Sequence, residues 1–538
     1  MMTAPKMNPL YRLMLAMASL VLLVLLAGSC ADEFIEVPEE DEDDIAGTTF
    51  DRSIAIAFGD PEATVSGDVH GIVSVSGNRV TVNNTTDDVI LYELSGSSDN
   101  GFFKLYSSRK QAIRLSNLIL VNPKGAAINN QSGKRTFVLV EGTNSLADGA
   151  KYTGTDGEDE KAAFFSEGQL IFSGTGSLTV TARGKAGITS DDYIHFMESP
   201  TVKVSTSAGH AVSGKEAVIV SGGQLDVATS ADMKKGFSSD SLVRIEGGKT
   251  AITVTGSTAY DRKKNKDTGT AGIKADQLFE MLGGDLVIHN SGIGGKGISS
   301  DGPGYFKGGT VTITTTGANY GNSNSTPSKG IKVDGDLSFS GTVVSVTSKF
   351  HEGISSKGAI DISGGVLYIC ASDDAINAAG DLTIQGGSVC AWSTGNDGMD
   401  ANGNLYIKGG LVYAIGTHAP EVALDANTDD NYKLYVQGGT LIAIGGLESD
   451  AVLTQSCYAA PWSPNTWYGL TVGLSTFAFK TPASGGDPLV VSGVPTPSLQ
   501  AGVSVSGGTT LFNGLGVKDG TVSGGTSVNL SNYSSTLP

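Results

Sequence analysis

Cysteine, proline and charge are all scarce in this chain, and each scarcity excludes a class of protein. The four cysteines among 538 residues form no CxxC pair and have no histidines at zinc-binding spacing, so no zinc site is predicted. Charged residues make up 17% and prolines number 16, which is not the composition of a disordered protein. The formal net charge of -19 argues against binding nucleic acid through its phosphates.

Helical periodicity is also missing, whereas glycine is abundant. No amphipathic helical period lies between the predicted strands, which excludes a solenoid that carries helices. The 74 glycines are about one residue in seven, roughly twice the usual share, and suit many short strands separated by turns. A chain of 538 residues is too long for one ordinary compact domain unless it is a repeat array.

The amino terminus has the features of a targeting signal. Lys6 and Arg12 precede an apolar run from Leu13 to Leu26, which is too short and too close to the end for a spanning helix. Small residues then lead to Cys30, a pattern that resembles a bacterial lipoprotein signal, although Ala27 stands where Leu is commonest. We therefore expect residues 1–29 to be a signal peptide and Cys30 to be lipidated. The alternative is an ordinary secretory peptide that is cleaved nearby.

Residues 30–50 form an acidic tether. Nine acids and no base lie within residues 31–44. The ADEFIE stretch after Cys30 resembles the short export tag of lipoproteins displayed on the outer face of some Gram-negative cells. It predicts an outer membrane lipoprotein that is exposed at the cell surface. The alternative is a tether that is merely solvated.

A repeat of turn, strand, glycine pair and strand runs through most of the chain. It is clearest in HEGISSKGAIDISGGVLYICA, SDDAINAAGDLTIQGGSVCAWSTG and GNDGMDANGNLYIKGGLVYAIG. Each unit contains an anchor, a Gly or Ala followed by an apolar residue, and from Gly330 the anchors advance by 23, 22, 23 and 25 residues. The anchors are Ala127, Ala163, Gly187, Ala211, Gly236, Gly272, Gly297, Gly330, Gly353, Ala375, Gly398 and Ala423.

Strands this short cannot bury an apolar face alone, so each unit must stack on its neighbours. The pattern predicts an all-β fold, a right-handed parallel β-helix of about twelve coils, one for each anchor. A stack of coils must also close its two ends. We expect an N-terminal β cap with the first coils in 51–160, the regular β-helix in 161–447, and a C-terminal β closing unit in 448–538.

The repeat phrases in 164–194, 371–410 and 421–446 resemble bacterial secreted proteins of the carbohydrate-binding domain-containing family. The resemblance implies a pectate-lyase-like right-handed β-helix. It also implies binding of cellulose and of acidic pectin-type polymers, with calcium on the helix. The identity of the glycan depends on a few surface residues and does not follow from the fold.

Acidic and amide side chains gather on the last coils. Residues 366–432 contain nine acids and one base, Lys408. Side chains just before the anchors, or two positions after them, should face outward on neighbouring coils. Two carboxylates about 4.8 Å apart repel by about 3 kcal/mol at an effective dielectric constant near ~20. Such oxygen donors suit calcium, and the predicted ligands are Asp374, Asn377, Asp397, Asp400 and Asp425. The alternative is a ladder that caps turns and points its carboxylates into water.

Three aromatic residues, Tyr368, Trp392 and Tyr413, follow successive glycine pairs on the same coils. Stacked rings on an outer face would offer flat platforms for sugars, so these residues are the predicted carbohydrate contacts. The alternative is that the apolar face continues through Ile415 and Ile442 and is covered by the C-terminal unit. Cys370 and Cys390 should lie diagonally on adjacent coils, at the edge of disulfide reach.

The sequence favours a binding protein over an enzyme. A lyase of this fold needs a basic residue beside its calcium, and Lys332 lies three coils from Asp400, about 14 Å away by strand spacing. Fragments of the motifs that β-helical glycosidases place on successive coils do occur, but they stand in the wrong order and far apart in this chain. We expect a non-catalytic, cell-surface carbohydrate-binding lipoprotein that binds polysaccharide with the help of calcium. The alternatives are a surface adhesin or scaffold for protein partners, and a calcium-dependent polysaccharide lyase.

Overall fold

The computed structural model describes residues 43–153, 157–321 and 326–535. Two compact units, Met1–Gly47 and Thr48–Pro538, divide the chain. In the first, the described part is short and holds the 3₁₀ turn η1 (Ile45–Gly47). The predicted signal peptide, Cys30 and most of the predicted acidic tether lie outside the described residues. Among the described residues, no helix is long and apolar enough to span a membrane. All further description concerns Thr48–Pro538.

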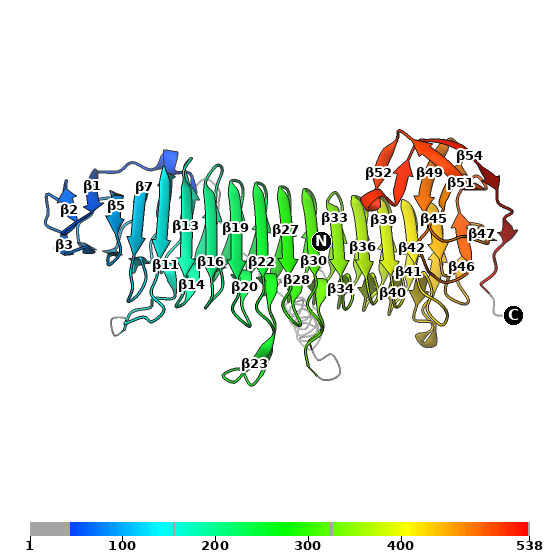
Figure 1. The fold of residues 1–538 in the computed structure, drawn as a ribbon, viewed down its shortest axis with the longest axis horizontal. Coiled ribbons are helices and arrows are strands. Elements are labelled where there is room, and N and C mark those ends of the chain that lie inside the picture. The colour runs from blue at the N-terminus through cyan, green and yellow to red at the C-terminus, as the bar shows by residue number, and fades with distance from the viewer. Residues whose placement is uncertain (1–42, 154–156, 322–325, 536–538) are drawn as a thin grey trace, which may run out of the picture. The chain divides into compact units, whose positions relative to one another are not determined.

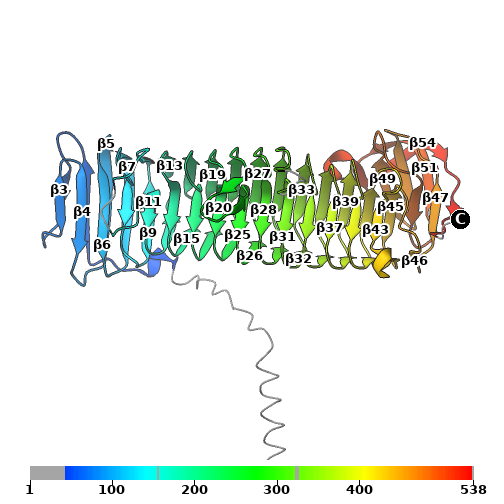
Figure 2. The same ribbon diagram turned by 90° about the horizontal axis from the view of Figure 1, so that it is seen from below.

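Three parallel sheets run along this unit, and each coil contributes one strand to each of them (Figures 1 and 2). The first sheet consists of β3 (Val73–Ser76), β4 (Arg79–Asn84), β6 (Phe102–Ser107), β8 (Ile128–Asn130), β11 (Ala162–Ser166), β14 (Ala186–Ser190), β17 (Val212–Gly214), β20 (Lys235–Ser239), β25 (Ala271–Ala275), β28 (Lys296–Ser300), β31 (Lys329–Val333), β34 (Ile354–Ser356), β37 (Ile376–Ala378), β40 (Met399–Ala401) and β43 (Leu424–Ala426). β3 pairs antiparallel with β4, and the other strands are parallel.

The second sheet follows the first in each coil. It consists of β9 (Thr136–Glu141), β12 (Leu170–Ser173), β15 (Tyr193–Phe196), β18 (Ala217–Val220), β21 (Leu242–Ile245), β26 (Leu278–Met281), β29 (Gly304–Phe306), β32 (Leu337–Phe339), β35 (Ile360–Ile362), β38 (Leu382–Ile384), β41 (Leu405–Ile407), β44 (Leu434–Val436) and β46 (Val452–Leu453).

The third sheet completes each coil. It consists of β10 (Thr143–Ala147), β13 (Ser177–Ala182), β16 (Thr201–Thr206), β19 (Gln224–Thr229), β22 (Lys249–Val254), β27 (Asp285–Asn290), β30 (Thr310–Thr315), β33 (Val343–Ser348), β36 (Val366–Ala371), β39 (Ser388–Ser393), β42 (Leu411–Ile415) and β45 (Thr440–Ile444). At the start of the array, the long strand β7 (Gln111–Val121) pairs with both β9 and β10, so one strand feeds the second and third sheets.

The parallel β-helix is confirmed, but it has about fourteen coils rather than twelve, counted over the described residues. The parallel strands of the first sheet begin at β4 and β6, before the first anchor at Ala127. In register with Ala127, these two coils carry Phe102 and Arg79 instead of Gly or Ala, so an alignment on the anchor did not include them. Upstream, β1 (Arg52–Phe58) pairs antiparallel with β2 (Thr64–Ser66) and parallel with β5 (Ile90–Ser98), which joins β7.

Alternating apolar residues of all three sheets point inward and form one continuous core. Ile376, Leu405 and Val412, one residue from each sheet, are completely buried. The glycine pairs sit at the corner between the second and third sheets. At Gly410 the backbone φ is +79°, and a Cβ there would lie 2.8 Å from the backbone of Gly386 on the preceding coil. The corner therefore requires glycine both for its conformation and for its close stacking.

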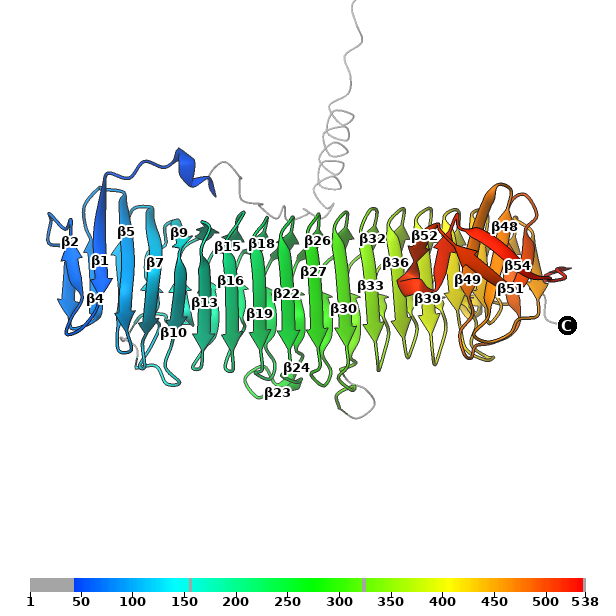
Figure 3. The ribbon, with the colours of Figure 1, turned by 45° about the horizontal axis from the view of Figure 1, so that its top comes forward.

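The C-terminal residues close the array and cover part of the third sheet (Figure 3). β50 (Leu489–Ser492) pairs antiparallel with β45 and with β47 (Cys457–Ala460), and β47 also pairs with β55 (Ser531–Asn532). A separate antiparallel sheet is formed by β48 (Trp467–Val472), β49 (Ser475–Lys480), β51 (Ser498–Ser506), β52 (Thr509–Leu511), β53 (Gly516–Lys518) and β54 (Thr521–Ser527). Two short turns, η3 (Thr428–Asp430) and η4 (Phe512–Gly514), and a projecting hairpin of β23 (Ala259–Asp261) and β24 (Lys266–Thr268) complete the described elements.

Candidate functional site

The predicted acidic ladder exists on the last coils of the first sheet. Asn377 on β37 pairs with Asp400 on β40, and Asp400 pairs with Asp425 on β43, so the three side chains form one outward column. Asp374 and Asp397 precede the same strands. The Asn377 side-chain amide donates to Asp374 Oδ2 at 3.0 Å and to Asp400 Oδ2 at 2.7 Å. The amide therefore separates two carboxylates that would otherwise repel.

The carboxylates of Asp374 and Asp397 also accept hydrogen bonds from the backbone of the next coil. Asp397 N donates to Asp374 Oδ1 at 3.2 Å, and Val422 N donates to Asp397 Oδ1 at 2.6 Å. Both residues are buried. These bonds tie the ladder to the turns that lead into the first sheet, so the ladder has a structural role whatever it binds.

An acidic groove of about 420 Å³ opens beside the ladder. Six carboxylate residues contribute to its wall, and no Lys or Arg does so. The groove is lined by Asp397, Asp400, Asn402, Pro420, Glu421, Asp425, Ala426, Asn427, Thr428, Asp429 and Glu448. Of the five predicted residues, Asp397, Asp400 and Asp425 line the groove. Asp374 and Asn377 do not line it and are held by the hydrogen bonds described above.

Burial makes the ionised forms of these carboxyl groups costly. It raises the pKa of Asp374 to about 8 and that of Asp397 to about 7, although hydrogen bonds from Asn377 and from Val422 N oppose the shift. Burial, followed by the negative charges of Glu352, Asp373 and Glu421, raises the pKa of Asp400 to about 6.

Ionisation of the Asp425 carboxyl group, at the end of the ladder, is costly for the same reason. Burial and the adjacent Glu448 carboxyl raise the pKa of Asp425. A cation in the groove would offset the repulsion among these groups and return them to their ionised forms. Oxygen donors from carboxylates, with Asn402, Asn427 and Thr428 nearby, form a donor set that fits a hard cation such as calcium.

The predicted ligands do not converge on one point. Within the described residues, two groups of three His, Cys, Asp or Glu side chains bring their ligand atoms within 4.8 Å of one another. They are His351, Glu352 and Asp373, and Asp159, Glu167 and Asp191. In the second group the Lys161 ammonium lies 3.0 Å from Asp159 and 2.5 Å from Asp191, so a side-chain cation already occupies it.

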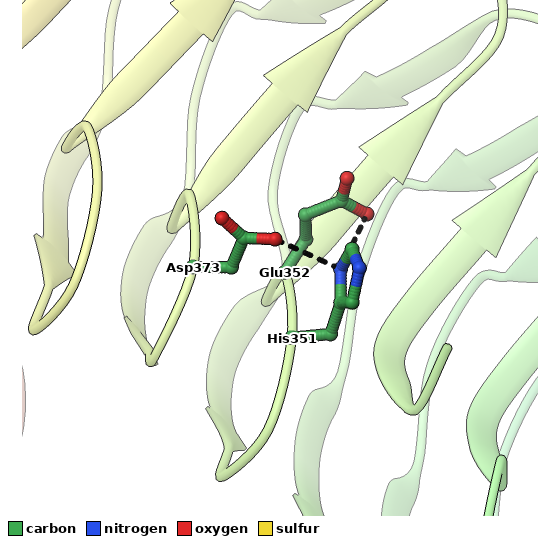
Figure 4. Close-up of side chains that lie close together, drawn as sticks. All are labelled: His351, Glu352 and Asp373. Atoms are coloured by element: carbon green, nitrogen blue, oxygen red, sulfur yellow. Dashed lines mark ion pairs between the residues drawn. The ribbon is translucent and has the colours of Figure 1, made fainter. Parts of the chain in front are cut away.

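The sequence analysis did not predict the first group, in which His351 and Glu352 lie one coil before Asp374 and Asp373 adjoins it (Figure 4). His351 Nδ1 is 3.1 Å from Asp373 Oδ2 and 3.6 Å from Glu352 Oε2. Lys329 forms an ion pair with Glu352 and donates to Ser355 Oγ at 3.0 Å. The sequence analysis weighed Lys332 as the basic residue of a lyase and did not consider His351 or Lys329, which contact Glu352 on the coil before Asp374.

Glu448 belongs to the ladder and was also missed. Leu447 pairs with Leu424 in parallel, and Ala423 N donates to Gly446 O, so Gly446-Leu447-Glu448 repeats Ala423-Leu424-Asp425 on the next coil. The spacing of 23 residues carries the signal. A thirteenth anchor at Gly446 would have revealed it, but the analysis ended the array at Ala423.

The three aromatic residues do not form a sugar platform. Tyr368 pairs with Cys390, and Cys390 with Tyr413, whereas Trp392 lies in the neighbouring column between Cys370 and Ile415. The rings are therefore not stacked on one another.

The C-terminal unit covers this face. Tyr413 is completely buried, donates to Lys480 O at 2.9 Å, and meets the Phe479 ring edge-on at 5.3 Å. Tyr368 and Trp392 pack against the same apolar cluster, which includes Tyr468 and Phe477. The prediction that Tyr413 contacts sugar is wrong because β49 occupies the space above it. Cys370 and Cys390 are diagonal neighbours, as expected, and both are free thiols.

A partly exposed aromatic pair lies on the second sheet instead, on the coils of the acidic groove. Tyr406 on β41 pairs with Tyr435 on β44, and their rings stack at 4.9 Å with an interplanar angle of 13°. The Lys408 ammonium lies 4.5 Å from the centre of the Tyr406 ring. The matching phrases LYI and LYV carried the signal, but the sequence analysis considered only the strands after the glycine pairs.

Three comparisons with known proteins complete this description. No curated protein matches the chain. Among solved structures, the polysaccharide lyase-like protein from C. thermocellum, studied as a gadolinium derivative, is 20% identical with a TM-score of 0.40, over 48% of this chain and 99% of that one. The family model described as carbohydrate-binding domain-containing protein matches residues 76–240 and 315–460, more than half of the chain and all of the acidic groove. The chain belongs to this carbohydrate-binding domain-containing family.

Proposed function

We propose that the protein is a non-catalytic, cell-surface lipoprotein that binds polysaccharide at the acidic groove with calcium as the bridging ion. The observation that carries the proposal is the groove itself, with six carboxylate residues, no base, and family membership over the coils that form it. Asp397, Asp400, Asp425 and Glu448 line the groove without converging on one point, so their side chains would have to draw together to hold the cation. A calcium ion there would supply the positive charge that an anionic sugar needs in order to approach.

Neutral glucans would make a different contact. The Tyr406–Tyr435 pair lies on the same coils as the groove and presents partly exposed ring surface and phenol hydroxyls. Aromatic rings pack against the C–H faces of sugars, and hydroxyls bond to theirs, so the pair suits a neutral chain without a metal ion. It replaces Trp392 as the candidate for this role.

A pull-down on pectin-type and cellulose-type insoluble polymers, with and without chelator, tests the groove. The variant Asp400→Asn with Asp425→Asn should lose the calcium-dependent part of pectin binding and keep cellulose binding. Asp226→Asn, an exposed carboxylate on the third sheet, is the matched control. Equal calcium-dependent binding by the groove variant and the wild type would refute the proposal, and failure of the wild type to bind either polymer would favour a protein-binding adhesin.

A calcium-dependent lyase is the second candidate, and His351 is the observation that favours it. Its imidazole lies 3.1 Å from the carboxylate of Asp373, the residue before Asp374, so a group that could act as a base stands beside the ladder. An absorbance assay for unsaturated products decides between the two candidates. Product formed by the wild type and lost in His351→Gln would establish the lyase, and no product with polyuronate and calcium supports the binding protein.

A further inference from the structure

The first sheet changes the sign of its charge along its length. The acidic ladder occupies its last coils, whereas the coils immediately before carry lysines. Lys235, Ala271, Lys296 and Lys329 pair in succession and form one outward column. Ser238, Lys274, Ser299 and Lys332 form the neighbouring outward column. We call Lys235, Lys274, Lys296 and Lys332 the lysine ladder.

The two columns alternate, so successive coils from β20 to β31 each present a lysine of the ladder. Neighbouring strands are about 4.8 Å apart, so a positive charge recurs at roughly that step along the helix axis. This step is comparable with the length of one sugar residue in a polysaccharide. The two columns are three residues apart along each strand, roughly 10 Å, so a straight polymer would follow one column. In that column Lys235 and Lys296 lie two coils apart, which is about the length of two sugar residues, so alternate carboxylates of the polymer could face them.

The carboxylates that face the lysine ladder neutralise only part of it. They belong to Asp240, Asp276, Asp301 and Asp334, which follow the strands of the first sheet. Lys274 Nζ lies 2.9 Å from Asp276 and 2.6 Å from Asp301. Lys332 pairs with Asp334 and lies 3.8 Å from Asp301. Two members of the ladder are therefore already paired.

Lys235 and Lys296 have no such partner. Within the described residues neither forms an ion pair, and the Lys235 ammonium donates only to Met233 O, at 2.9 Å. Both side chains are half-buried. Burial and the charges of neighbouring lysines lower the pKa of each to about 8, with Lys234 and Lys264 acting on Lys235, and Lys332 and Lys329 on Lys296. The charges of Asp276 near Lys235 and of Asp334 near Lys296 offset these effects only in part. An anion bound beside either ammonium would favour its charged form.

A basic hairpin adds to the same region. The tip between β23 and β24 contains Arg262, Lys263 and Lys264, and the hairpin projects from the stack of coils just before β25 (Figure 1). Lys274 and Lys296 lie between the two segments that the family model matches. Lys235 and Lys332 lie within the matched segments, so the lysine ladder extends from the matched part of the chain across the unmatched coils.

We propose that the lysine ladder binds the carboxylates of an anionic polysaccharide directly, without calcium, and that Lys235 and Lys296 make the principal contacts. This inference rests on the proposed function in taking a polysaccharide as the ligand. It adds a second contact surface, so a polyuronate chain would bind through ammonium groups on one part of the first sheet and through calcium on the other.

Binding of soluble polygalacturonate in the presence of chelator tests the ladder separately from the groove. The wild type should bind, and binding should weaken as salt is added because exposed charges are screened. Lys235→Met with Lys296→Met should weaken binding by about a hundredfold, about tenfold for each charge-assisted contact that is lost. Lys235→Arg with Lys296→Arg should retain it, and Lys203→Met, on the third sheet, should have no effect. Methyl-esterified pectin, which has the same backbone without the charge, should not bind at the ladder.

Two results would overturn the inference. One is absence of polygalacturonate binding by the wild type in chelator at low salt. The other is equal binding by the wild type and the methionine variant under those conditions. The groove variant Asp400→Asn with Asp425→Asn should keep this chelator-resistant binding, so failure of the ladder and failure of the groove give different results.

Discussion

Asp400 and Asp425 face outward from paired positions on adjacent coils, and both carboxyl groups are held away from bulk water. Two ionised carboxylates one strand spacing apart, about 4.8 Å, repel each other strongly. The Asn377 amide donates a hydrogen bond to Asp400 and so stabilises that carboxylate. Asp425, in contrast, lies next to a second acid, Glu448. This arrangement stabilises the fold only when protons or a cation balance the charge.

Calcium should stabilise the protein against heat, and chelation should remove the effect. A ligand that binds only the folded state adds about 2.7 kcal/mol to the free energy of unfolding at 100 times its dissociation constant. Asp400→Asn with Asp425→Asn should melt at the same temperature with and without chelator. Calorimetry on both proteins measures the difference, and a calcium response that survives in the variant would show that the cation binds elsewhere.

The metal-free protein should become less stable as pH rises from about 4 to about 8. The pKa of Asp374 is raised to about 8 and that of Asp397 to about 7, above the ordinary value of 3.8. The folded state therefore binds more protons than the unfolded state in this window, and the free energy of unfolding falls as pH rises. Urea titrations across the window in chelator measure it.

Asp397→Asn provides the control for this pH dependence, because an amide cannot titrate. Its stability should change less with pH than that of the wild type. Calcium should show the opposite trend and stabilise the wild type more at pH 8 than at pH 5, since the ligands must lose their protons to bind it. A calcium effect that is independent of pH would contradict the assignment of these carboxyl groups as ligands.

Tyr413→Ala should destabilise the protein without affecting glycan binding. The ring is completely buried between β42 and β49, and removing a buried aromatic side chain typically costs about 3–5 kcal/mol. Tyr413→Phe, which removes only the hydrogen bond to Lys480 O, should cost about 1 kcal/mol. Chemical unfolding measures both values, and loss of glycan binding in the well-folded phenylalanine variant would restore Tyr413 as a candidate contact.

Tyr435→Ala should have the reverse effect. The ring is partly exposed, so stability should change little, whereas binding to cellulose-type polymer should fall because the stack with Tyr406 is lost. Pull-down with chelator present measures this contribution without interference from the groove. Unchanged cellulose binding would exclude the tyrosine pair as the neutral-glycan contact.

Cys30→Ala should release the protein from membranes into a soluble fraction if this cysteine carries the lipid. Fractionation of cells that produce each form measures the change. Display at the surface needs a separate measurement, and protease treatment of intact cells provides it. A variant that sediments with membranes as the wild type does would contradict lipidation at Cys30.

The repeat made most of the fold predictable, because each coil repeats the same local pattern and neighbouring coils pair only with one another. The column of Asn377, Asp400 and Asp425 follows from the 22- to 25-residue spacing alone. The first two coils were missed because their turns lack the anchor, and Glu448 because the search stopped one coil early. In both cases the repeat spacing that aligns these coils with their neighbours can be read from the sequence.

The burial of Tyr413 could not be derived in the same way. The alternation of the strand correctly places its ring on the outer face, and only the packing of Phe479, 66 residues further along the chain, buries it. His351 was missed for a related reason, since it lies in a turn that local strand pairing does not position. Contacts of this kind depend on tertiary packing, which the repeat does not encode.

The antiparallel pairing of β50 with β45 limits how another copy of the protein could add strands to the end of the third sheet. A parallel stack of coils ends in a row of free backbone groups that another stack could continue, and so would propagate into fibrils. β50 runs in the opposite direction and occupies those groups, and β47 and β55 extend the reversed strands outward. The end of the third sheet therefore offers no parallel template that another copy of the protein could continue.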